Sequence, residues 1–124
     1  MTTKKVLLVE DNEDTRRMMR LIIELNGYEV VEATNGIEAI DVAESQHPDL
    51  IFMDVGLPRL DGVAAIRTIK SLNSCSQTPV CVITALKEAS QSALDAGCQE
   101  VISKPVNFDV VERILSQHLA GEFH

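Results

Sequence analysis

The stretch Leu50-Ile51-Phe52-Met53, followed directly by Asp54, decides the fold of this 124-residue chain. Its four apolar residues are continuous rather than alternating, so a strand built from them is apolar on both faces. Such strands belong inside parallel sheets that helices cover on both sides. The stretch therefore predicts a buried central strand, with Asp54 as the first polar residue after it.

Four more short apolar runs alternate with helical patterns around this stretch, at residues 6–9, 30–31, 80–83 and 101–102. Turn and helix-ending signals separate them, namely Asn26-Gly27, Asn35-Gly36, His47-Pro48 and Gly97. Five βα units in a row predict an α/β domain with right-handed crossovers. We expect a flavodoxin-like, doubly wound parallel sheet of five strands in the order 2-1-3-4-5, with five helices on its two faces.

Each predicted helix carries apolar residues at helical spacing, which we expect to face the sheet. These residues are Met18, Leu21, Ile22 and Leu25 in the first helix, Ile37, Ile40 and Ala43 in the second, Ala65, Ile66 and Ile69 in the third, Ala89, Ala93 and Ala96 in the fourth, and Phe108, Val111, Ile114, Leu115 and Leu119 in the fifth. Gly62 is expected to open the third helix, and Asn107 to cap the fifth. We expect residues 1–124 to form one domain with its core at about residues 5–119, and residues 121–124 resemble a cloning-derived tail.

The composition limits the classes of partner. The chain is 45% hydrophobic and 24% charged, as in ordinary globular proteins, and its 19 acidic and 11 basic residues give a formal net charge of −8. This charge repels nucleic-acid phosphates, so we expect no direct nucleic-acid partner. No apolar run approaches the roughly 20 residues of a membrane span, so we expect no membrane insertion.

The three cysteines, Cys75, Cys81 and Cys98, are odd in number and have no CxxC spacing. This pattern argues against a disulfide framework and against a zinc site, and it favours buried thiols in a reducing compartment. The amino-terminal residues lead directly into the first apolar run and do not resemble a signal peptide. We therefore expect a cytoplasmic protein.

Polar residues stand where four of the five apolar runs end: Glu10-Asp11, Asp54, Thr84 and Lys104. Ligands of open α/β sheets bind beyond the carboxyl ends of the strands. The predicted fold therefore brings three carboxylates, one hydroxyl and one ammonium group to a single rim of the sheet.

Three carboxylates at close range repel one another, and Lys104 neutralises only part of their charge. The remaining negative charge calls for a hard cation. An incomplete oxygen cage with room for water and phosphate suits Mg²⁺, with Mn²⁺ as an alternative. Beside such an ion, Asp54 could act as a nucleophile toward phosphorus. Lys104 and Thr84 would then offset charge on the phosphoryl oxygens.

Four blocks of the sequence together resemble the response-regulator receiver family: Val9-Glu10-Asp11, residues 54–62 (Asp-Val-Gly-Leu-Pro-Arg-Leu-Asp-Gly), Thr84-Ala85 and Lys104-Pro105. The blocks follow the family's order, and the likeness covers about residues 5–119. The resemblance implies a chemotaxis-regulator-like signalling switch of a two-component or phosphorelay system. It implies no enzyme beyond phosphoryl acceptance and slow autodephosphorylation.

The resemblance also implies roles for single residues. Asp54 would accept the phosphoryl group, and Thr84 and Lys104 would bind it. Asp11 and Asp54 would ligate the magnesium ion directly, and Glu10 would assist, mostly through water. The backbone carbonyl of Gly56 would complete the protein's share of ligands. The donor would be a histidine kinase or a histidine phosphotransfer protein. The resulting conformational change would alter binding to a downstream protein, which the sequence does not identify.

Two departures from the family pattern concern how phosphorylation is transmitted. Many receivers carry Tyr or Phe three residues before the lysine, where this chain has Val101. The separation between Thr84 and Lys104 is 20 positions, slightly shorter than the family pattern, and the shortening falls within residues 85–97. We therefore expect an unconventional route from Asp54 to the partner surface.

Two other functions are open on the same fold. A magnesium-dependent phosphatase with an aspartyl nucleophile would need a second carboxylate just beyond Asp54, where the chain has Val55 and Gly56. A flavin-binding electron carrier would need a phosphate-binding loop after the first strand and aromatic residues, which make up 3% of this chain. Turnover of a small phosphate ester would favour the first function, and a coloured pure protein the second.

Overall fold

The computed structural model describes residues 3–55, 62–85 and 88–119. Five strands form one sheet in the order β2-β1-β3-β4-β5, as predicted. They are β1 (Lys5–Val9), β2 (Glu29–Ala33), β3 (Leu50–Asp54), β4 (Val80–Thr84) and β5 (Glu100–Ser103). Every pair of neighbouring strands is parallel, so the carboxyl ends of all five strands lie along one edge of the sheet.

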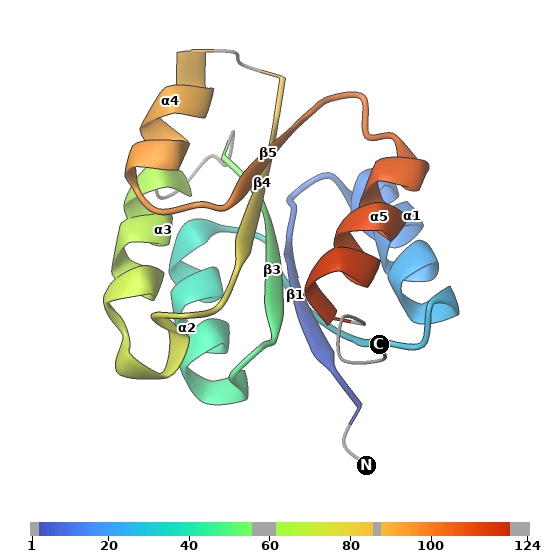
Figure 1. The fold of residues 1–124 in the computed structure, drawn as a ribbon, viewed down its shortest axis with the longest axis horizontal. Coiled ribbons are helices and arrows are strands. Elements are labelled where there is room, and N and C mark those ends of the chain that lie inside the picture. Colours follow the sequence, from blue (N-terminus) through green and yellow to red (C-terminus); the bar gives the residue numbers. More distant parts are fainter. Residues whose placement is uncertain (1–2, 56–61, 86–87, 120–124) are drawn as a thin grey trace.

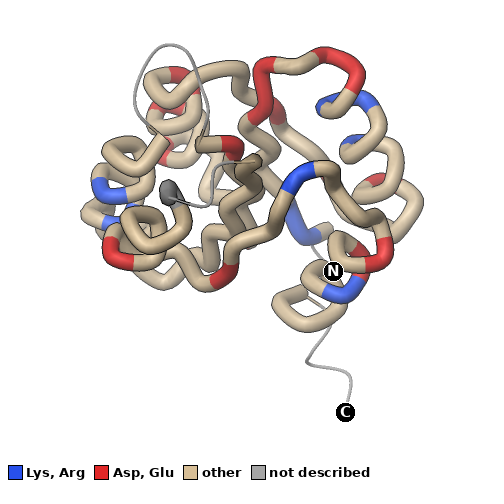
Figure 2. Tube along the Cα trace, turned by 90° about the horizontal axis from the view of Figure 1, so that it is seen from above, with Lys and Arg blue, Asp and Glu red and all other residues tan. Residues whose placement is uncertain are grey.

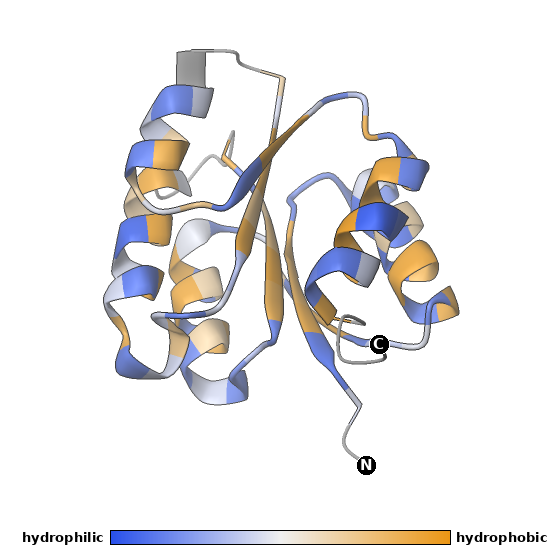
Figure 3. Cartoon of the chain, viewed as in Figure 1, coloured by the Kyte–Doolittle hydropathy of each residue, from blue (hydrophilic) through white to orange (hydrophobic). Residues whose placement is uncertain are grey.

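Helices cover both faces of the sheet (Figure 1). On one face lie α1 (Glu13–Leu25) and α5 (Phe108–Leu119), and on the other lie α2 (Gly36–Gln46), α3 (Gly62–Ser71) and α4 (Glu88–Asp95). A short 3-10 helix, η1 (Asn73–Cys75), follows α3. In Figure 3 the strands of the sheet are largely orange, and the helices on both sides carry orange as well as blue stretches. Within the described ranges, no helix is long and apolar enough to cross a membrane.

The central strand β3 explains why the sheet needs helices on both faces. Its five residues are all buried, and successive side chains point to opposite faces. Leu50 and Phe52 belong to the apolar core under α1 and α5, whereas Ile51 and Met53 belong to the core under α2, α3 and α4. Burying one such side chain contributes about 1.5–3 kcal/mol. Both helical layers are therefore needed to keep this one strand out of water.

The helix ends follow the turn signals of the sequence. The side chains of Asn12 and Asn35 cap α1 and α2, because each accepts a hydrogen bond at 2.9 Å from the backbone N–H three residues further on. Gly27 and Gly97 follow α1 and α4 with φ of 93° and 113°, a left-handed conformation that favours glycine. Asn107 caps α5 and accepts the N–H of Asp109 at 2.8 Å, as predicted for this residue.

The prediction for the buried face of α1 is wrong for three of its four residues, whereas Ile22 is partly buried and packs against the core. Met19 and Ile23 are the buried residues of this helix, whereas Met18, Leu21 and Leu25 are 47%, 51% and 73% exposed. Apolar residues occupy two faces of α1, and periodicity alone does not say which face the sheet and α5 cover. Packing therefore buries Met19 and Ile23. It leaves Met18, Leu21 and Leu25 in solvent as an exposed apolar stripe.

Two smaller differences concern the first turns of other helices. Ile37, near the start of α2, is 58% exposed, and Phe108, at the start of α5, is half-buried rather than buried. Each stands where its helix begins, at the edge of the sheet. The remaining predicted core positions of α5 are buried, and the side chain of Ala89 in α4 lies outside the described part of the structure.

Candidate functional site

Five polar residues meet at the edge formed by the carboxyl ends of the strands. Glu10 and Asp11 follow β1, Asp54 ends β3, Thr84 ends β4, and Lys104 follows β5. Hydrogen bonds extend the sheet at this edge. The backbone N–H of Glu10 donates to the last residue of β2 at 3.1 Å, and that of Lys104 donates to the carbonyl of Thr84 at 3.0 Å. Figure 2 looks onto this edge and shows acidic positions, in red, along the loop after β1.

A lysine joins two buried carboxylates at this edge. Nζ of Lys104 lies 2.8 Å from Oδ2 of Asp54 and 3.5 Å from Oε1 of Glu10. Asp54 is 4% exposed and Glu10 is 0% exposed. Burying a charge is costly unless an opposite charge is near, and Lys104 brings one positive charge to two carboxyl groups. The buried cluster is therefore short of positive charge.

The pKa values of the cluster reflect this shortage. Burial raises the pKa of the Glu10 carboxyl above its usual range, and the charge of Asp54 raises it further, although the N–H of Asn12 and the ammonium of Lys104 act in the opposite direction. Burial by itself lowers the pKa of Lys104, but the hydrogen bond to Asp54 and the two carboxylate charges outweigh this effect and raise it. The pKa of Glu10 is thus raised at this edge, and the positive charge of a bound cation would lower it.

Three carboxylates at this edge are arranged to hold a hard cation. One oxygen each from Glu10, Asp11 and Asp54 lie within 4.8 Å of one another. Oε1 of Glu10 is buried and has no hydrogen-bond partner among the described residues, whereas Oε2 accepts the N–H of Asn12 at 3.1 Å. Oε1 of Glu10 thus has the ion pair with Lys104 at 3.5 Å but no hydrogen bond among the described residues, and this set of carboxylate oxygens fits Mg²⁺. Gly56, the fourth predicted ligand, lies outside the described residues.

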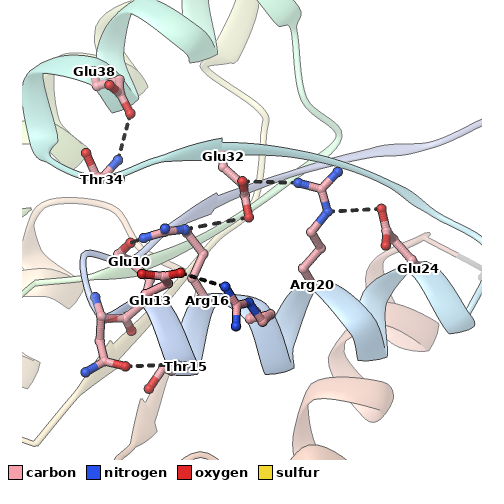
Figure 4. Close-up of polar contacts among 11 residues, drawn as sticks. Glu10, Glu13, Thr15, Arg16, Arg20, Glu24, Glu32, Thr34 and Glu38 are labelled. Atoms are coloured by element: carbon pink, nitrogen blue, oxygen red, sulfur yellow. Dashed lines mark hydrogen bonds and ion pairs between the residues drawn. The ribbon is translucent and has the colours of Figure 1, made fainter.

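The loop after β1 is held from the side by α1 and β2 (Figure 4). Arg16 donates from Nη1 to the carbonyl oxygen of Glu10 at 3.0 Å, and its Nε lies 3.7 Å from Oε2 of Glu32. Glu32 also pairs with Arg20 at 3.1 Å. These contacts fix the backbone that carries Glu10 and Asp11. No local sequence pattern indicates Arg16, because its partners are a backbone carbonyl and a carboxylate on another strand.

The chain directly after Asp54 passes close to the start of α3. A Cβ atom at Gly62 would lie 2.6 Å from Cα of Val55, so this approach needs glycine. The backbone N–H of Val55 donates to the carbonyl of Ile83 in β4 at 3.3 Å. The end of β3 is thus fixed from two sides, which positions the Asp54 carboxylate at the rim.

Comparison with known families supports this arrangement. A model of the response regulator receiver domain matches residues 6–116. The chain belongs to the response regulator receiver domain family. Receiver domains are the phosphorylation-activated switches of two-component signalling, and they work with histidine kinases or histidine phosphotransfer proteins. The family and fold predicted from the sequence are confirmed.

Individual relatives resemble this receiver domain over most of its length. The polar-differentiation response regulator DivK of Brucella ovis is 38% identical over 107 residues, which are 85% of this chain and 87% of that protein. The receiver domain of sensor histidine kinase PA1611 from Pseudomonas aeruginosa has a magnesium ion coordinated in its active-site cleft. It is 32% identical, with a TM-score of 0.88 over 96% of this chain and 99% of that chain. The chemotaxis response regulator CheY4 of Vibrio cholerae is 28% identical, with a TM-score of 0.88 over 95% of this chain and 100% of that chain.

The two departures from the family pattern both lie next to β4 of the receiver domain. Val101 pairs in register with Val82 and is half-buried against the core under α2, α3 and α4. The side chain at this position is therefore short and branched, and it packs on that core. Helix α4, which follows Thr84 in the shortened stretch, has eight residues. Thr84 itself is 4% exposed and lies one residue beyond the partner of Asp54 in the sheet.

An open groove borders Lys104 on the side of α1. It has a volume of about 250 Å³ and is lined by Asp14, Thr15, Met18, Lys104, Pro105, Val106 and Phe108. The peptide bond between Lys104 and Pro105 is cis. Met18 belongs both to this groove and to the exposed apolar stripe of α1, which continues through Leu21 and Leu25. Apolar surface therefore begins directly beside the charged edge.

Proposed function

We propose that the chain is a signalling switch in which Asp54 accepts the phosphoryl group. The position of Asp54 carries this proposal: its carboxylate stands at the rim, 2.8 Å from the ammonium of Lys104 and close to two more carboxylates. Glu10 is less suited as acceptor, because it is fully buried and a phosphodonor could not reach it. Asp11 is exposed, so a phosphoryl group there would be open to water.

In the proposed transfer, an oxygen of the Asp54 carboxylate attacks the phosphorus atom of a phosphohistidine. The O–P bond forms as the P–N bond breaks, and the imidazole leaves with the bonding electrons and takes up a proton. Lys104 would turn from the two carboxylates to a phosphoryl oxygen, and the hydroxyl of Thr84 would donate to another. Slow attack of water on the acyl phosphate would return the switch to its resting form.

The same proposal assigns the magnesium ligands to Glu10, Asp11, Asp54 and the backbone carbonyl of Gly56. The bound ion offsets negative charge on the phosphoryl oxygens. The grouping of the three carboxylates within 4.8 Å supports this assignment, as does the magnesium in the cleft of the PA1611 receiver domain. Mn²⁺ would be accepted by the same donors, because it also favours carboxylate and carbonyl oxygen.

We propose that the phosphohistidine-bearing protein docks over the groove beside Lys104 and the apolar stripe of α1. Exposed apolar residues arranged along one helix face are typical of a protein interface. Leu21→Glu should then slow transfer from a phosphorylated histidine phosphotransfer domain, while labelling by acetyl phosphate stays unchanged. Leu94→Glu is the matched control, because Leu94 on α4 is 45% exposed and lies outside the stripe. Equal transfer rates for both variants would contradict this docking site.

The conformational response would run through α4 rather than through an aromatic ring. Val101 offers no ring to move into space left by Thr84, so we propose that a shift of the short helix α4 against β4 alters the partner surface. We also place the switch in the cytoplasm. Its three cysteines are free thiols, which a reducing compartment maintains.

Intact-mass measurement after incubation with Mg²⁺ and acetyl phosphate tests the proposed acceptor. We expect one added phosphoryl group on the wild type and on Asp41→Asn, which changes a solvent-exposed carboxylate of α2, and none on Asp54→Asn. Circular dichroism checks that the variants are folded. Equal labelling of Asp54→Asn, or no labelling of the wild type, would overturn the assignment.

A further inference from the structure

Three side chains that share no sequence motif meet near the amino ends of the strands, at the far end of the sheet from Asp54. Cys81 in β4 and Glu100 in β5 are partners in the parallel register, so their side chains point to the same face. His118 stands in the last turn of α5, which packs over that face. One donor atom from each of the three residues lies within 4.8 Å of the other two.

The imidazole of His118 is incompletely satisfied. Its Nε2 atom is buried and has no hydrogen-bond partner in the part of the chain that the structure describes. Buried polar atoms nearly always have a partner, and leaving one unpaired is costly. A histidine with a buried, unpartnered nitrogen, grouped with a thiol and a carboxylate, is suited to bind a metal ion.

The neighbours of the cluster hold the carboxylate in place. Arg113, five residues before His118 on α5, donates from Nη2 to Oε1 of Glu100 at 2.5 Å. Its Nη1 donates to Gln117 at 2.9 Å, which fixes the guanidinium. Outer partners of this kind orient metal ligands in known metal sites. One oxygen of Glu100 is thus held by Arg113, and Arg113 lies on α5, the helix that also carries His118.

We propose that Cys81, Glu100 and His118 form a second metal site, which takes a transition-metal ion of the zinc class. Thiolate, imidazole and carboxylate together suit Zn²⁺ or Co²⁺, whereas Mg²⁺ favours oxygen alone. Three protein ligands leave a further position for water. The absence of a CxxC pattern argued against a zinc site in the sequence. That pattern detects only ligands that are close in sequence, whereas Cys81, Glu100 and His118 come from three separate elements.

Binding must displace the thiol proton. Burial raises the pKa of Cys81 to about 12, and the charge of Glu100 and the neighbouring Cys98 raise it too, whereas Arg113 lowers it. When the metal–sulfur bond forms, the S–H bond breaks and the proton leaves to the buffer. Affinity should therefore increase up to about tenfold for each pH unit on the alkaline side of neutrality.

Titration of the whole protein with Co²⁺ in excess Mg²⁺ tests this site, with the Mg²⁺ present to occupy the oxygen cluster around Asp54. Cobalt bound to a thiolate gives a charge-transfer absorption, which an oxygen site does not produce. We expect this absorption to saturate at one Co²⁺ per chain for the wild type, to vanish in Cys81→Ala, and to need about tenfold more Co²⁺ in His118→Gln. Calorimetry in two buffers of different ionisation enthalpy should detect the released proton.

Two controls separate the site from other thiols and histidines. Cys75→Ala changes a buried cysteine that belongs to the other core, and His47→Asn changes an exposed histidine with φ of 51°. Both should bind Co²⁺ like the wild type. If Cys81→Ala fails to fold, His118→Gln still decides, since a given concentration of Zn²⁺ should raise the melting temperature of the wild type more than that of this variant. No thiolate absorption in the folded wild type, or an unchanged titration of His118→Gln, would overturn the proposal.

Discussion

The two ends of the same sheet differ in chemistry, although each gathers three donor groups within 4.8 Å. The carboxyl end holds oxygen donors, with Lys104 against the two buried carboxylates of Glu10 and Asp54. The amino end holds sulfur, nitrogen and oxygen from Cys81, His118 and Glu100. The first set suits a hard cation and the second a borderline one. One fold can thus offer two cation sites of different preference.

The two ends also differ in how their residues are brought together. At the carboxyl end, every group stands at or just after the end of a strand, so the parallel direction of the strands is enough to assemble them. At the amino end, the strand register pairs Cys81 with Glu100, and the rotation of α5 adds His118. A site whose residues all follow strand ends can be predicted from the sequence. A site that also depends on how a helix is rotated about its axis cannot.

The largest effect at the carboxyl end is expected from Lys104→Met. The substitution leaves two buried carboxylates without their ammonium partner, so the free energy of unfolding in EDTA at pH 8 should fall by about 2 kcal/mol. Added Mg²⁺ should restore most of this loss, because it binds the folded state. Urea unfolding with and without Mg²⁺ measures both effects.

Lys5→Met is the control for this change. Nζ of Lys5 contacts Gln46 on the exposed surface, so its loss should cost less than about 0.5 kcal/mol, with no dependence on Mg²⁺. Equal losses in the two lysine variants would show that Lys104 does not neutralise the buried pair.

A smaller effect is expected from Glu10→Gln on the affinity for Mg²⁺. The variant keeps Asp11 and Asp54 but removes one negative charge, so the dissociation constant should rise about tenfold. Isothermal titration calorimetry measures it. Glu13→Gln, an exposed carboxylate paired with Arg17, should leave the constant within about twofold of the wild type. Unaltered affinity in Glu10→Gln would remove Glu10 from the magnesium site.

The same variant should show the pH dependence of the metal-free carboxyl end. The folded-state pKa of Glu10 is raised above its ordinary value of 4.5. In the pH window between these two pKa values, the folded protein therefore holds a proton that the unfolded chain has lost. The wild type therefore loses stability as pH rises through the window, whereas a glutamine does not titrate. We expect Glu10→Gln to be more stable than the wild type at pH 8, with an advantage that shrinks as the pH falls toward 4.5.

Urea unfolding in EDTA between these two pH values measures the difference. A variant that is less stable than the wild type at pH 8 would mean that the contacts of Glu10 with Asn12 and Lys104 outweigh the cost of burying its charge.

The smallest effect is expected when Mg²⁺ competes with Co²⁺ for the amino end of the sheet, where we expect no change in cobalt binding. A hundredfold excess of Mg²⁺ should leave the cobalt–thiolate absorption at the amino end unaltered, since Mg²⁺ does not compete for sulfur and nitrogen donors. Displacement of Co²⁺ by Mg²⁺ would show that both ions use one site, and the distinction between the two ends would fail.

Much of the carboxyl end could be predicted from the sequence. Continuous apolar runs marked the strands, and the polar residues that follow them, Glu10, Asp11, Asp54, Thr84 and Lys104, were expected at one rim. The structure brings them to that rim. Their individual roles in phosphoryl transfer stay predictions.

By itself, the sequence determined the five strands, the cap at Asn107 and the rim, because each depends on local pattern or on the shared direction of parallel strands. The strand order followed from the choice of a flavodoxin-like fold. Only the tertiary structure decided the rest. It left Met18, Leu21 and Leu25 in solvent, since packing against the sheet and α5 sets the rotation of α1. It also brought His118 to Cys81, because contacts between distant elements depend on how helices pack on the sheet and leave no periodic trace in the chain.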